Sequence, residues 1–332
     1  MENPETNDQD FNFDNRIPLA QLQQAIDGVK QQLGQIVIGQ DDFIEQLIVG
    51  LLANGHVLIE GVPGIAKTIT AKLFARSLDT DFSRIQFTPD LMPSDVLGTS
   101  VFNLKSSEFE FNRGPVFANV VLIDEINRAP AKTQAALFEV MEERQITMDG
   151  ETYGMEFPFI VLATQNPIEQ EGTYALPEAQ LDRFLFKITV DYPKLEDEVE
   201  ILKTQHQRRM KTPENEVKPI IKPDQLKVFQ DQVQQVVIED KLFGYIAQLI
   251  DKTRNHPHLY LGGSPRASLA IMNAAKAFAA VQGRDFVLPD DIKRSLAPVL
   301  RHRIILSPER EMEGMTPETV IDMITHSVEI PR

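Results

Sequence analysis

Residues 56–68 read HVLIEGVPGIAKT, an apolar run followed by a loop of small residues, a lysine and a threonine. The first part, His56–Glu60, predicts a short buried strand, and the segment Thr68–Leu78 predicts a helix. A loop of small residues lets backbone N–H groups turn inward, and here a helix N-terminus, an ammonium and a hydroxyl follow it. These groups, in this order, are typical of a loop that binds nucleotide phosphates and Mg²⁺.

The loop departs from the common pattern at Ala66, where a second glycine usually precedes the lysine. Alanine is small and compatible with the start of a helix, so we expect the loop to tolerate it. The residues predicted to bind the nucleotide are those of the loop and the first helical turn: Gly61, Val62, Pro63, Gly64, Ile65, Ala66, Lys67, Thr68 and Ile69.

A second apolar segment, Val120–Ile123, ends in two carboxylates, Asp124 and Glu125. This arrangement is expected where one acid supports Mg²⁺ and the next polarises an attacking water molecule. Together with the phosphate loop it predicts magnesium-dependent nucleotide hydrolysis. Thr68 and Asp124 are then the predicted metal-binding residues, and Glu125 is the predicted base.

Strand-like and helix-like stretches alternate around these two segments. Further strands are predicted over Phe82–Phe87, Phe159–Thr164 and Phe184–Val190. Such alternation predicts a mostly parallel sheet with helices on both faces, which is an α/β fold. Two stretches break the alternation and predict inserted β-hairpins, 100–104 with 108–112 and 145–148 with 151–153, the second around an Asp-Gly turn.

After Tyr192-Pro193 the strand signal disappears, and only helices are predicted to the end of the chain. Several of them begin with proline, whose missing N–H costs nothing in a first helical turn. We therefore expect an acidic N-terminal arm (residues 1–15), an αβα core (16–191) and a helical lid domain (192–332), with the nucleotide in the cleft between core and lid. The predicted lid helices cover 194–210, 223–236, 241–254, 265–281, 289–299 and 317–325.

The composition narrows the functional classes. With 332 residues the chain has room for about two domains. Its formal net charge of −16 repels a phosphate backbone, so nucleic-acid binding is not expected. The absence of cysteine excludes disulfides, zinc fingers, iron–sulfur ligation and thiol catalysis. No membrane span and no signal peptide are predicted, so a cytoplasmic protein is the default expectation.

Five motifs occur in the order found in AAA+ ATPases: GVPGIAKT (61–68), VVLIDEINRA (120–129), ATQNP (163–167), LPEAQLDRF (176–184) and LGGSPRA (261–267). The combination most closely resembles the MoxR family, and the resemblance covers Ile38 to about Arg303. It implies a P-loop (AAA+) domain that hydrolyses ATP with Mg²⁺ and a helical lid behind it. The two hairpins match the helix-two insert and the pre-sensor insert of the wider clade.

The resemblance also implies roles for single residues. Ile38 and Gly39 would lie near the adenine, and Asn166 matches the first sensor, which positions water or the γ-phosphate. Arg183 matches the arginine finger, and Arg266 matches the second sensor on the helical domain. Arg128 and Arg144 are rival candidates for an arginine that acts on a neighbouring subunit's site.

At the level of function, the resemblance implies a homo-oligomeric ring, most simply a hexamer, because an arginine finger normally arrives from a neighbouring subunit. The family's role is chaperone-like: it remodels or matures client proteins, including metal-cofactor insertion, often with von Willebrand factor A domain partners. Three alternatives stay open: a magnesium-chelatase-like motor subunit, an ATP-switched binding module with little turnover, and a nucleic-acid motor. The intact Asp124-Glu125 pair opposes the second, and the acidic charge opposes the third.

Overall fold

The computed structural model describes residues 17–62, 64–105, 107–166, 173–208, 212 and 215–331. The predicted acidic arm, residues 1–15, and Pro63 of the phosphate loop therefore lie outside the described residues.

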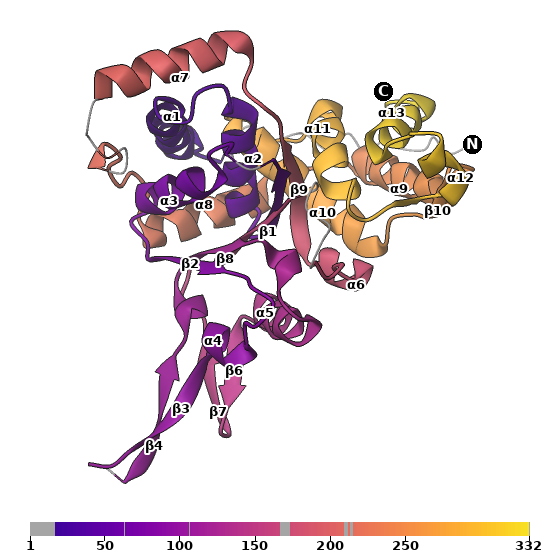
Figure 1. The fold of residues 1–332 in the computed structure, drawn as a ribbon. Helices are drawn as coiled ribbons and strands as arrows, with labels where there is room; N and C mark the ends of the chain where they lie inside the picture. Colours follow the sequence, from indigo (N-terminus) through magenta and orange to yellow (C-terminus); the bar gives the residue numbers. More distant parts are fainter. Residues whose placement is uncertain are drawn as a thin grey trace, which may run out of the picture.

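A five-stranded parallel sheet forms the centre of the molecule, with strand order β2-β5-β8-β1-β9 (Figure 1). Its strands are β1 (His56–Gly61), β2 (Phe82–Gln86), β5 (Val120–Asp124), β8 (Ile160–Gln165) and β9 (Phe184–Val190). All five were predicted from the sequence to within one or two residues. Because every strand runs in the same direction, all strand C-termini share one edge of the sheet, here called the carboxyl edge, and all N-termini share the opposite amino edge.

Successive side chains of the central strands point to opposite faces, and each face has its own hydrophobic core. In β1 and β5, Val57 and Leu122 join the core under α1 (Ala20–Gly34), α2 (Asp41–Leu52) and α3 (Lys67–Ser77). Leu58 and Ile123 join the second core, under α5 (Ala131–Glu143). Apolar residues on both faces explain why these strands read as continuous hydrophobic runs. The predicted α/β fold with helices on both faces is confirmed.

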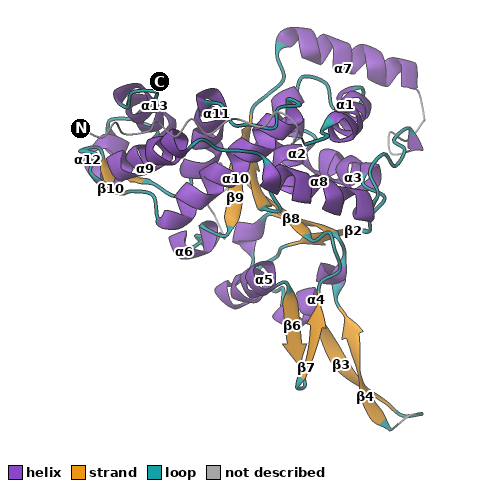
Figure 2. Cartoon of the chain, turned by 180° about the vertical axis from the view of Figure 1, so that it is seen from behind, coloured by secondary structure: helices purple, strands orange, loops and turns teal. Residues whose placement is uncertain are grey.

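Both predicted hairpins are present and project from the sheet domain side by side (Figures 1 and 2). They consist of β3 (Gly98–Asn103) with β4 (Glu108–Arg113), and of β6 (Gln145–Met148) with β7 (Glu151–Gly154). In the second turn Asp149 and Gly150 have φ of 53° and 85°, the left-handed pair that a two-residue hairpin turn needs. Ser100 donates a hydrogen bond to Asp149, and the Phe111 and Tyr153 rings lie 4.7 Å apart, so the hairpins support each other.

The chain after β9 is mostly helical, as predicted. Its predicted helices are α7 (Leu195–Arg208), α8 (Pro223–Gln235), α9 (Asp240–Arg254), α10 (Pro265–Val281), α11 (Pro289–Leu300) and α13 (Pro317–Ser327), and the short α12 (Pro308–Met312) was not predicted. The expectation that no strand follows Pro193 is wrong, because β10 (Leu259–Leu261) pairs antiparallel with β11 (Ile305–Leu306). These strands have three and two residues, too few for an alternating pattern to show in the sequence.

In the sheet domain two short α-helices were not predicted, α4 (Pro93–Leu97) and α6 (Glu178–Leu181). Each is a single helical turn next to a functional segment: α4 leads into the first hairpin, and α6 ends two residues before Arg183. Within the described ranges, no helix is long and apolar enough to cross a bilayer.

Candidate active site

The carboxyl edge gathers the predicted nucleotide site. Gly61 ends β1, Asp124 ends β5, and Asn166 directly follows β8, the strand that lies between them. In the register, Glu60 pairs with Gln165, so Asn166 comes next to the start of the phosphate loop. Three segments far apart in the sequence therefore meet at one point because parallel strands end together.

Glycine is required at Gly61 by close packing and at Gly64 by backbone conformation. A Cβ at Gly61 would lie 2.7 Å from the backbone oxygen of Val190 and 2.4 Å from Ile65 Cδ1. Gly64 has φ of 85°, and nothing lies within 4 Å of where its Cβ would be. The loop thus packs tightly against the sheet at its start and is open at its tip, where phosphates would approach.

The backbone conformation of Ala66 is not the helical one expected at the start of a helix. It precedes α3 with φ of 62° and ψ of 17°, in the left-handed region, and the helix begins at Lys67. An L-residue in this region costs about 1 kcal/mol or more because its Cβ crowds the following carbonyl oxygen. The loop keeps the turn that glycine normally supplies, with a strained alanine in its place.

Lys67 and Thr68 open α3 and face the two carboxylates. Lys67 Nζ donates to the backbone oxygen of Gly61 at 2.5 Å, and burial lowers the pKa of its half-buried ammonium while Asp124 and Glu125 oppose that shift. Thr68 Oγ1 donates to Asp124 Oδ2 at 3.5 Å. The Lys67 ammonium and the Thr68 hydroxyl are therefore close to the two acids that were predicted to act with them. Ile69 continues the helix and packs against the core.

Asp124 is held by groups from three neighbouring segments. Thr164 Oγ1 on β8 donates to Asp124 Oδ1 at 3.1 Å and accepts the N–H of Glu125 at 3.0 Å. Arg84 Nε on β2 donates to Asp124 Oδ2 at 2.6 Å. One carboxylate oxygen is thus fixed by the buried threonine, and the other is shared between Thr68 and the half-exposed Arg84.

Glu125 stands just beyond the strand in a strained conformation, with φ of 59° and ψ of 53°. Its Oε2 accepts the Gln86 amide at 2.7 Å and lies 3.1 Å from Arg128 Nε. Strained backbone of this kind persists only where surrounding structure over-determines it, and it is concentrated at active sites. The side chain is oriented by two donors and is partly exposed.

The oxygen groups fit Mg²⁺. One carboxylate and one hydroxyl, Asp124 and Thr68, converge, and Mg²⁺ in phosphate-transfer sites uses one or two carboxylates together with substrate phosphates rather than an all-protein cage. Within the described ranges, no group of three or more His, Asp or Glu is placed to hold a metal.

Arg183 and Arg266 lie at the amino edge, away from their own phosphate loop. Both contact Glu142 near the end of α5: Arg183 Nε at 3.5 Å and Arg266 Nη2 at 3.2 Å. Just beyond Glu142, Arg144 donates to the backbone oxygens of Asn54 and Phe159, directly before β1 and β8 begin. That places the end of α5 at the amino edge.

The seven residues of β9 separate Arg183 from the carboxyl edge. At about 3.3 Å per residue this is roughly 20 Å, beyond the reach of an arginine side chain. The structure therefore brings Lys67, Thr68, Asp124, Glu125 and Asn166 together, and it brings Arg183 and Arg266 together, but it does not join the two groups within one chain.

Ile38 and Gly39 lie in the turn between α1 and α2, against the segment that leads into α7. Gly39 has φ of 74°, and a Cβ there would lie 2.6 Å from Asp197 Oδ2. Gln40 Nε2 donates to the backbone oxygen of Asp191 at 3.0 Å. The turn is thus tied to the chain that leaves β9, and the structure itself does not assign it an adenine.

Sequence reasoning missed the role of Thr164 on β8, which holds Asp124. It also missed two further site residues, Arg84 and Gln86. Both lie on β2, a strand that was predicted, but nothing in the sequence shows that β2 pairs with β5. In that pairing Gln86 lies opposite Asp124. Alternate polar residues on a strand next to an acidic strand end are the only sequence signal that could have found them.

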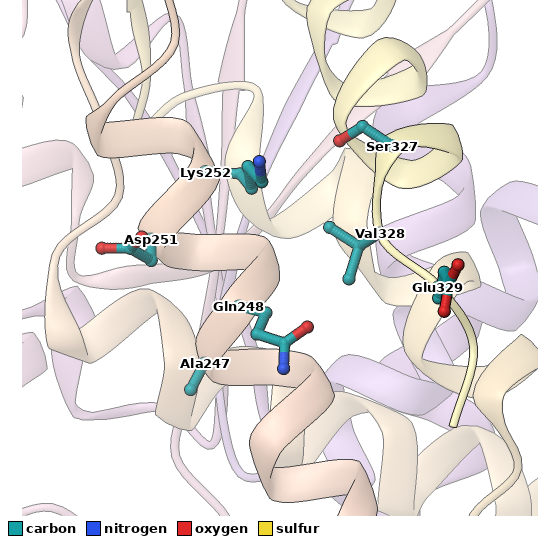
Figure 3. A pocket seen from close by; sticks show the side chains of 7 residues that line it. All are labelled: Ala247, Gln248, Asp251, Lys252, Ser327, Val328 and Glu329. Atoms are coloured by element: carbon teal, nitrogen blue, oxygen red, sulfur yellow. The ribbon is translucent and has the colours of Figure 1, made fainter. Parts of the chain in front are cut away.

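A cavity of about 560 Å³ lies elsewhere, in the helical domain between α9 and the end of α13 (Figure 3). Its walls carry one lysine and two acids, Lys252, Asp251 and Glu329, with Val328 between them. None of these residues belongs to a predicted motif, so the cavity contributes nothing to the phosphate site.

Comparison with known proteins agrees with this arrangement. The family model described as "ATPase family associated with various cellular activities (AAA)" matches residues 56–186, and the model described as "AAA lid domain" matches 251–324. The chain is 46% identical to an uncharacterized protein, YeaC, of Bacillus subtilis over 91% of this chain and 93% of the relative. It is 45% identical to Chaperone MoxR1 of Mycobacterium tuberculosis over 94% of this chain and 82% of the relative.

A crystal structure from Cytophaga hutchinsonii, described as a "putative ATPase", superposes with a TM-score of 0.86 at 41% identity and covers 93% of this chain and 96% of that one. The sheet order, the phosphate loop, the paired carboxylates and these relatives lead to one conclusion. The chain belongs to the MoxR family of AAA+ ATPases.

Proposed function

We propose that this protein hydrolyses ATP with Mg²⁺ and works as a ring in which each active site is built from two subunits. The observation that carries the proposal is the meeting of Lys67, Thr68, Asp124 and Glu125 at the carboxyl edge, with Arg183 and Arg266 on the opposite edge of the same sheet. One chain thus holds two half-sites that face away from each other.

At the carboxyl edge the proposed roles follow from chemistry and position. Backbone N–H groups of residues 61–66 and the Lys67 ammonium bind the phosphates, and Thr68 and Asp124 hold the metal. Bound Mg²⁺ would neutralise charge that develops on the phosphate oxygens. Glu125 accepts the proton of the attacking water, and Asn166 positions that water or the γ-phosphate. The turn at Ile38 and Gly39 lies near the adenine.

The arginines at the amino edge supply positive charge to the nucleotide site of the next subunit. Arg183 and Arg266 cannot reach the phosphates of their own chain, so a catalytic role for either requires a neighbour. Their common partner Glu142 holds both side chains on one face. The rivals fit this role less well: Arg144 is bound to two backbone oxygens, and Arg128 contacts the Glu125 of its own chain. A closed ring, most simply a hexamer, gives every site such a neighbour.

The cellular role that fits this machinery is that of a cytoplasmic chaperone that remodels or matures client proteins, including metal-cofactor insertion, with von Willebrand factor A domain proteins as partners. A relative named Chaperone MoxR1 supports it. We propose the same division of the chain as before: arm 1–15, core 16–191 and helical lid 192–332.

Two variants separate binding from hydrolysis. Lys67→Ala should lose ATP binding, because the cation that offsets the phosphate charge is removed. Glu125→Gln should bind ATP normally and lose turnover by at least about 10²-fold, since the metal site stays while the base is lost. Glu139→Gln changes an exposed acid on α5 and should leave both properties unchanged. Near-normal turnover in Glu125→Gln would contradict the role of Glu125.

The Glu125→Gln variant can also identify the client proteins. Glu125→Gln held in the ATP state should retain proteins that wild-type protein releases after hydrolysis. Proteins that co-purify with Glu125→Gln in ATP, and not with Lys67→Ala, are the candidates. If the two variants retain the same proteins, ATP binding does not control client contact and the chaperone role fails.

A further inference from the structure

Arg303, a buried residue of the helical domain, forms hydrogen bonds with the segment that carries Arg183. Arg303 Nε donates to Asp182 Oδ1 at 2.6 Å. Its Nη2 donates to the backbone oxygens of Asp182 at 3.1 Å and Phe184 at 2.6 Å. Its Nη1 donates to the backbone oxygen of Leu185 at 3.1 Å. The carbonyls on both sides of Arg183 are therefore fixed by one guanidinium.

The last N–H of Arg303 donates to the backbone oxygen of Val299 at 2.5 Å, so all five guanidinium donors are satisfied. The residue is only 9% exposed. A buried guanidinium carries a large desolvation cost, which excellent geometry and a carboxylate must offset. Four of its five donors end on residues 182–185.

Two residues near Arg303 also form hydrogen bonds with this segment. His302, also buried, lies with Nε2 3.0 Å from the backbone oxygen of Phe184. Burial holds the pKa of His302 well below its usual value, so the ring is neutral and donates through Nε2. Ser264 Oγ, two residues before Arg266, donates to Asp182 Oδ2 at 3.3 Å. Both oxygens of Asp182 are therefore bound by the helical domain.

From these contacts we infer that Arg303, through Asp182, is a positioning residue that holds Arg183 in place for the neighbouring subunit's site. The inference rests on the proposed function, in which Arg183 acts on that site. Within the described residues, the Arg183 side chain forms one ion pair, with Glu142, so its orientation depends strongly on the backbone at 182–185. A displacement of about 1 Å at a catalytic group can cost on the order of 10²-fold in rate.

Asp182→Asn is the most informative variant, because Arg303 keeps its four other hydrogen bonds and the fold is retained. We expect the kcat for ATP to fall by about 10- to 100-fold while the dissociation constant for ATP changes less than about twofold. Arg303→Lys keeps the charge but loses the planar fork and should show the same split.

Asp291→Asn is the matched control. Asp291 is a buried acid whose carboxylate accepts hydrogen bonds from both Nη atoms of Arg284 at 2.7 Å and from the Leu288 N–H, all within the helical domain. It should lose comparable thermal stability and keep its kcat. An equal loss of kcat in Asp291→Asn and Asp182→Asn would mean that general loosening of the helical domain, not positioning, explains the effect.

Paired variants then show which half of the site is damaged. Two differently tagged variants are co-expressed, and assemblies that contain both are isolated by two affinity steps. Asp182→Asn with Glu125→Gln should recover turnover above either variant alone, because an intact base meets an intact Arg183 at some interfaces. Asp182→Asn with Arg183→Ala should recover nothing, because both damage the same half-site.

Three results overturn the inference, and they are distinguishable from one another. In the first, turnover recovers when Arg183→Ala is paired with Glu125→Gln but not when Asp182→Asn is paired with Glu125→Gln. Asp182 and Arg303 then have no positioning role, and the proposed function stays intact. Recovery of Asp182→Asn with Arg183→Ala places Asp182 in the other half-site. No recovery by any pair, or no assembly containing both tags, removes the shared site itself.

Discussion

The two edges of the central sheet hold their charged residues in different ways. At the carboxyl edge, Asp124 and Glu125 share oxygens among several donors, and the backbone is strained at Ala66 and Glu125. At the amino edge, Arg183 stands on a backbone fixed by a buried arginine with every donor satisfied. In the proposed function, the first edge would exchange partners when a nucleotide binds, and the second would present one side chain in a fixed place.

Under the proposed function, a complete site needs one edge from each of two subunits. Strained residues and shared carboxylate oxygens can rearrange around an incoming ligand at low cost. A residue that must reach a neighbour's phosphates gains nothing from such freedom, because its contribution depends on geometry.

Arg183→Ala should lower the kcat for ATP by on the order of 10³-fold with little change in ATP binding, because charge stabilisation on the γ-phosphate is lost while the phosphate loop stays intact. Steady-state turnover and binding of labelled ATP measure the two quantities. Arg144→Ala is the control at the same edge: it removes hydrogen bonds to the backbone oxygens of Asn54 and Phe159 and should lower stability more than kcat. The reverse pattern would transfer the catalytic role to Arg144.

His56, at the start of β1, should make the amino edge sensitive to acid. Burial and the nearby positive charge of Arg144 lower its pKa from 6.5 to about 4, although the Met141 backbone oxygen, 3.0 Å from Nε2, opposes the shift. In the folded protein Nδ1 of the ring accepts the Val161 N–H. Between these values the unfolded ring is protonated and the folded ring is not. Unfolding therefore takes up a proton, and stability falls as pH drops from about 6.5 towards 4, by up to about 3 kcal/mol.

Urea unfolding of the nucleotide-free protein across this pH range measures the effect. His56→Gln removes the titrating group, so its free energy of unfolding should depend less steeply on pH, whatever its value at pH 7. His302 has the same sign of shift and remains in both proteins. An unchanged pH slope in His56→Gln would contradict the assignment.

At the carboxyl edge, Arg84→Ala should tighten Mg²⁺ binding. Arg84 Nε shares Asp124 Oδ2 with Thr68 and so competes with the metal for that oxygen. Since Arg84 is half exposed, its ion pair contributes at most about 1 kcal/mol, which limits the effect to roughly fivefold. Magnesium titration of ATPase activity should show a lower half-saturating concentration, with Arg84→Lys in between. A higher one would mean that Arg84 orients Asp124 for the metal.

Ala66→Gly should stabilise the protein by about 0.5–1 kcal/mol, because glycine adopts the left-handed conformation at φ of 62° without the Cβ clash. Ala71→Gly, in the interior of α3, should have the opposite sign, a loss of about 1 kcal/mol. Urea unfolding of both variants compares them directly. Destabilisation by Ala66→Gly would show that the loop is not strained at this position.

Sequence patterns predicted the sheet domain because its signals are local. The run Val120–Asp124 is buried on both faces, and the Asp149-Gly150 turn needs left-handed residues, so each stretch carries its own evidence. Short elements such as β10 and β11 form only because tertiary structure pairs them, and two or three residues carry no periodic signal.

The candidate site divides in the same way. The residues with recognisable spacing, from Lys67 to Glu125, were named in advance, and the structure brings them together. Arg84, Gln86 and Arg303 could not be named, because their contacts depend on which strands and helices become neighbours. Arg303 and Asp182 lie 121 residues apart, and no local pattern links them.

If Arg183 completes the site of a neighbouring subunit, co-assembly of two inactive variants should restore ATP hydrolysis. Arg183→Ala and Glu125→Gln carry different tags, are co-expressed, and are purified through both tags, so every assembly contains both chains. Interfaces that join the intact base of one chain to the intact Arg183 of the other should hydrolyse ATP, and turnover should rise well above either variant alone. Turnover no higher than that of the separate variants, in assemblies proven to contain both chains, would contradict the shared site.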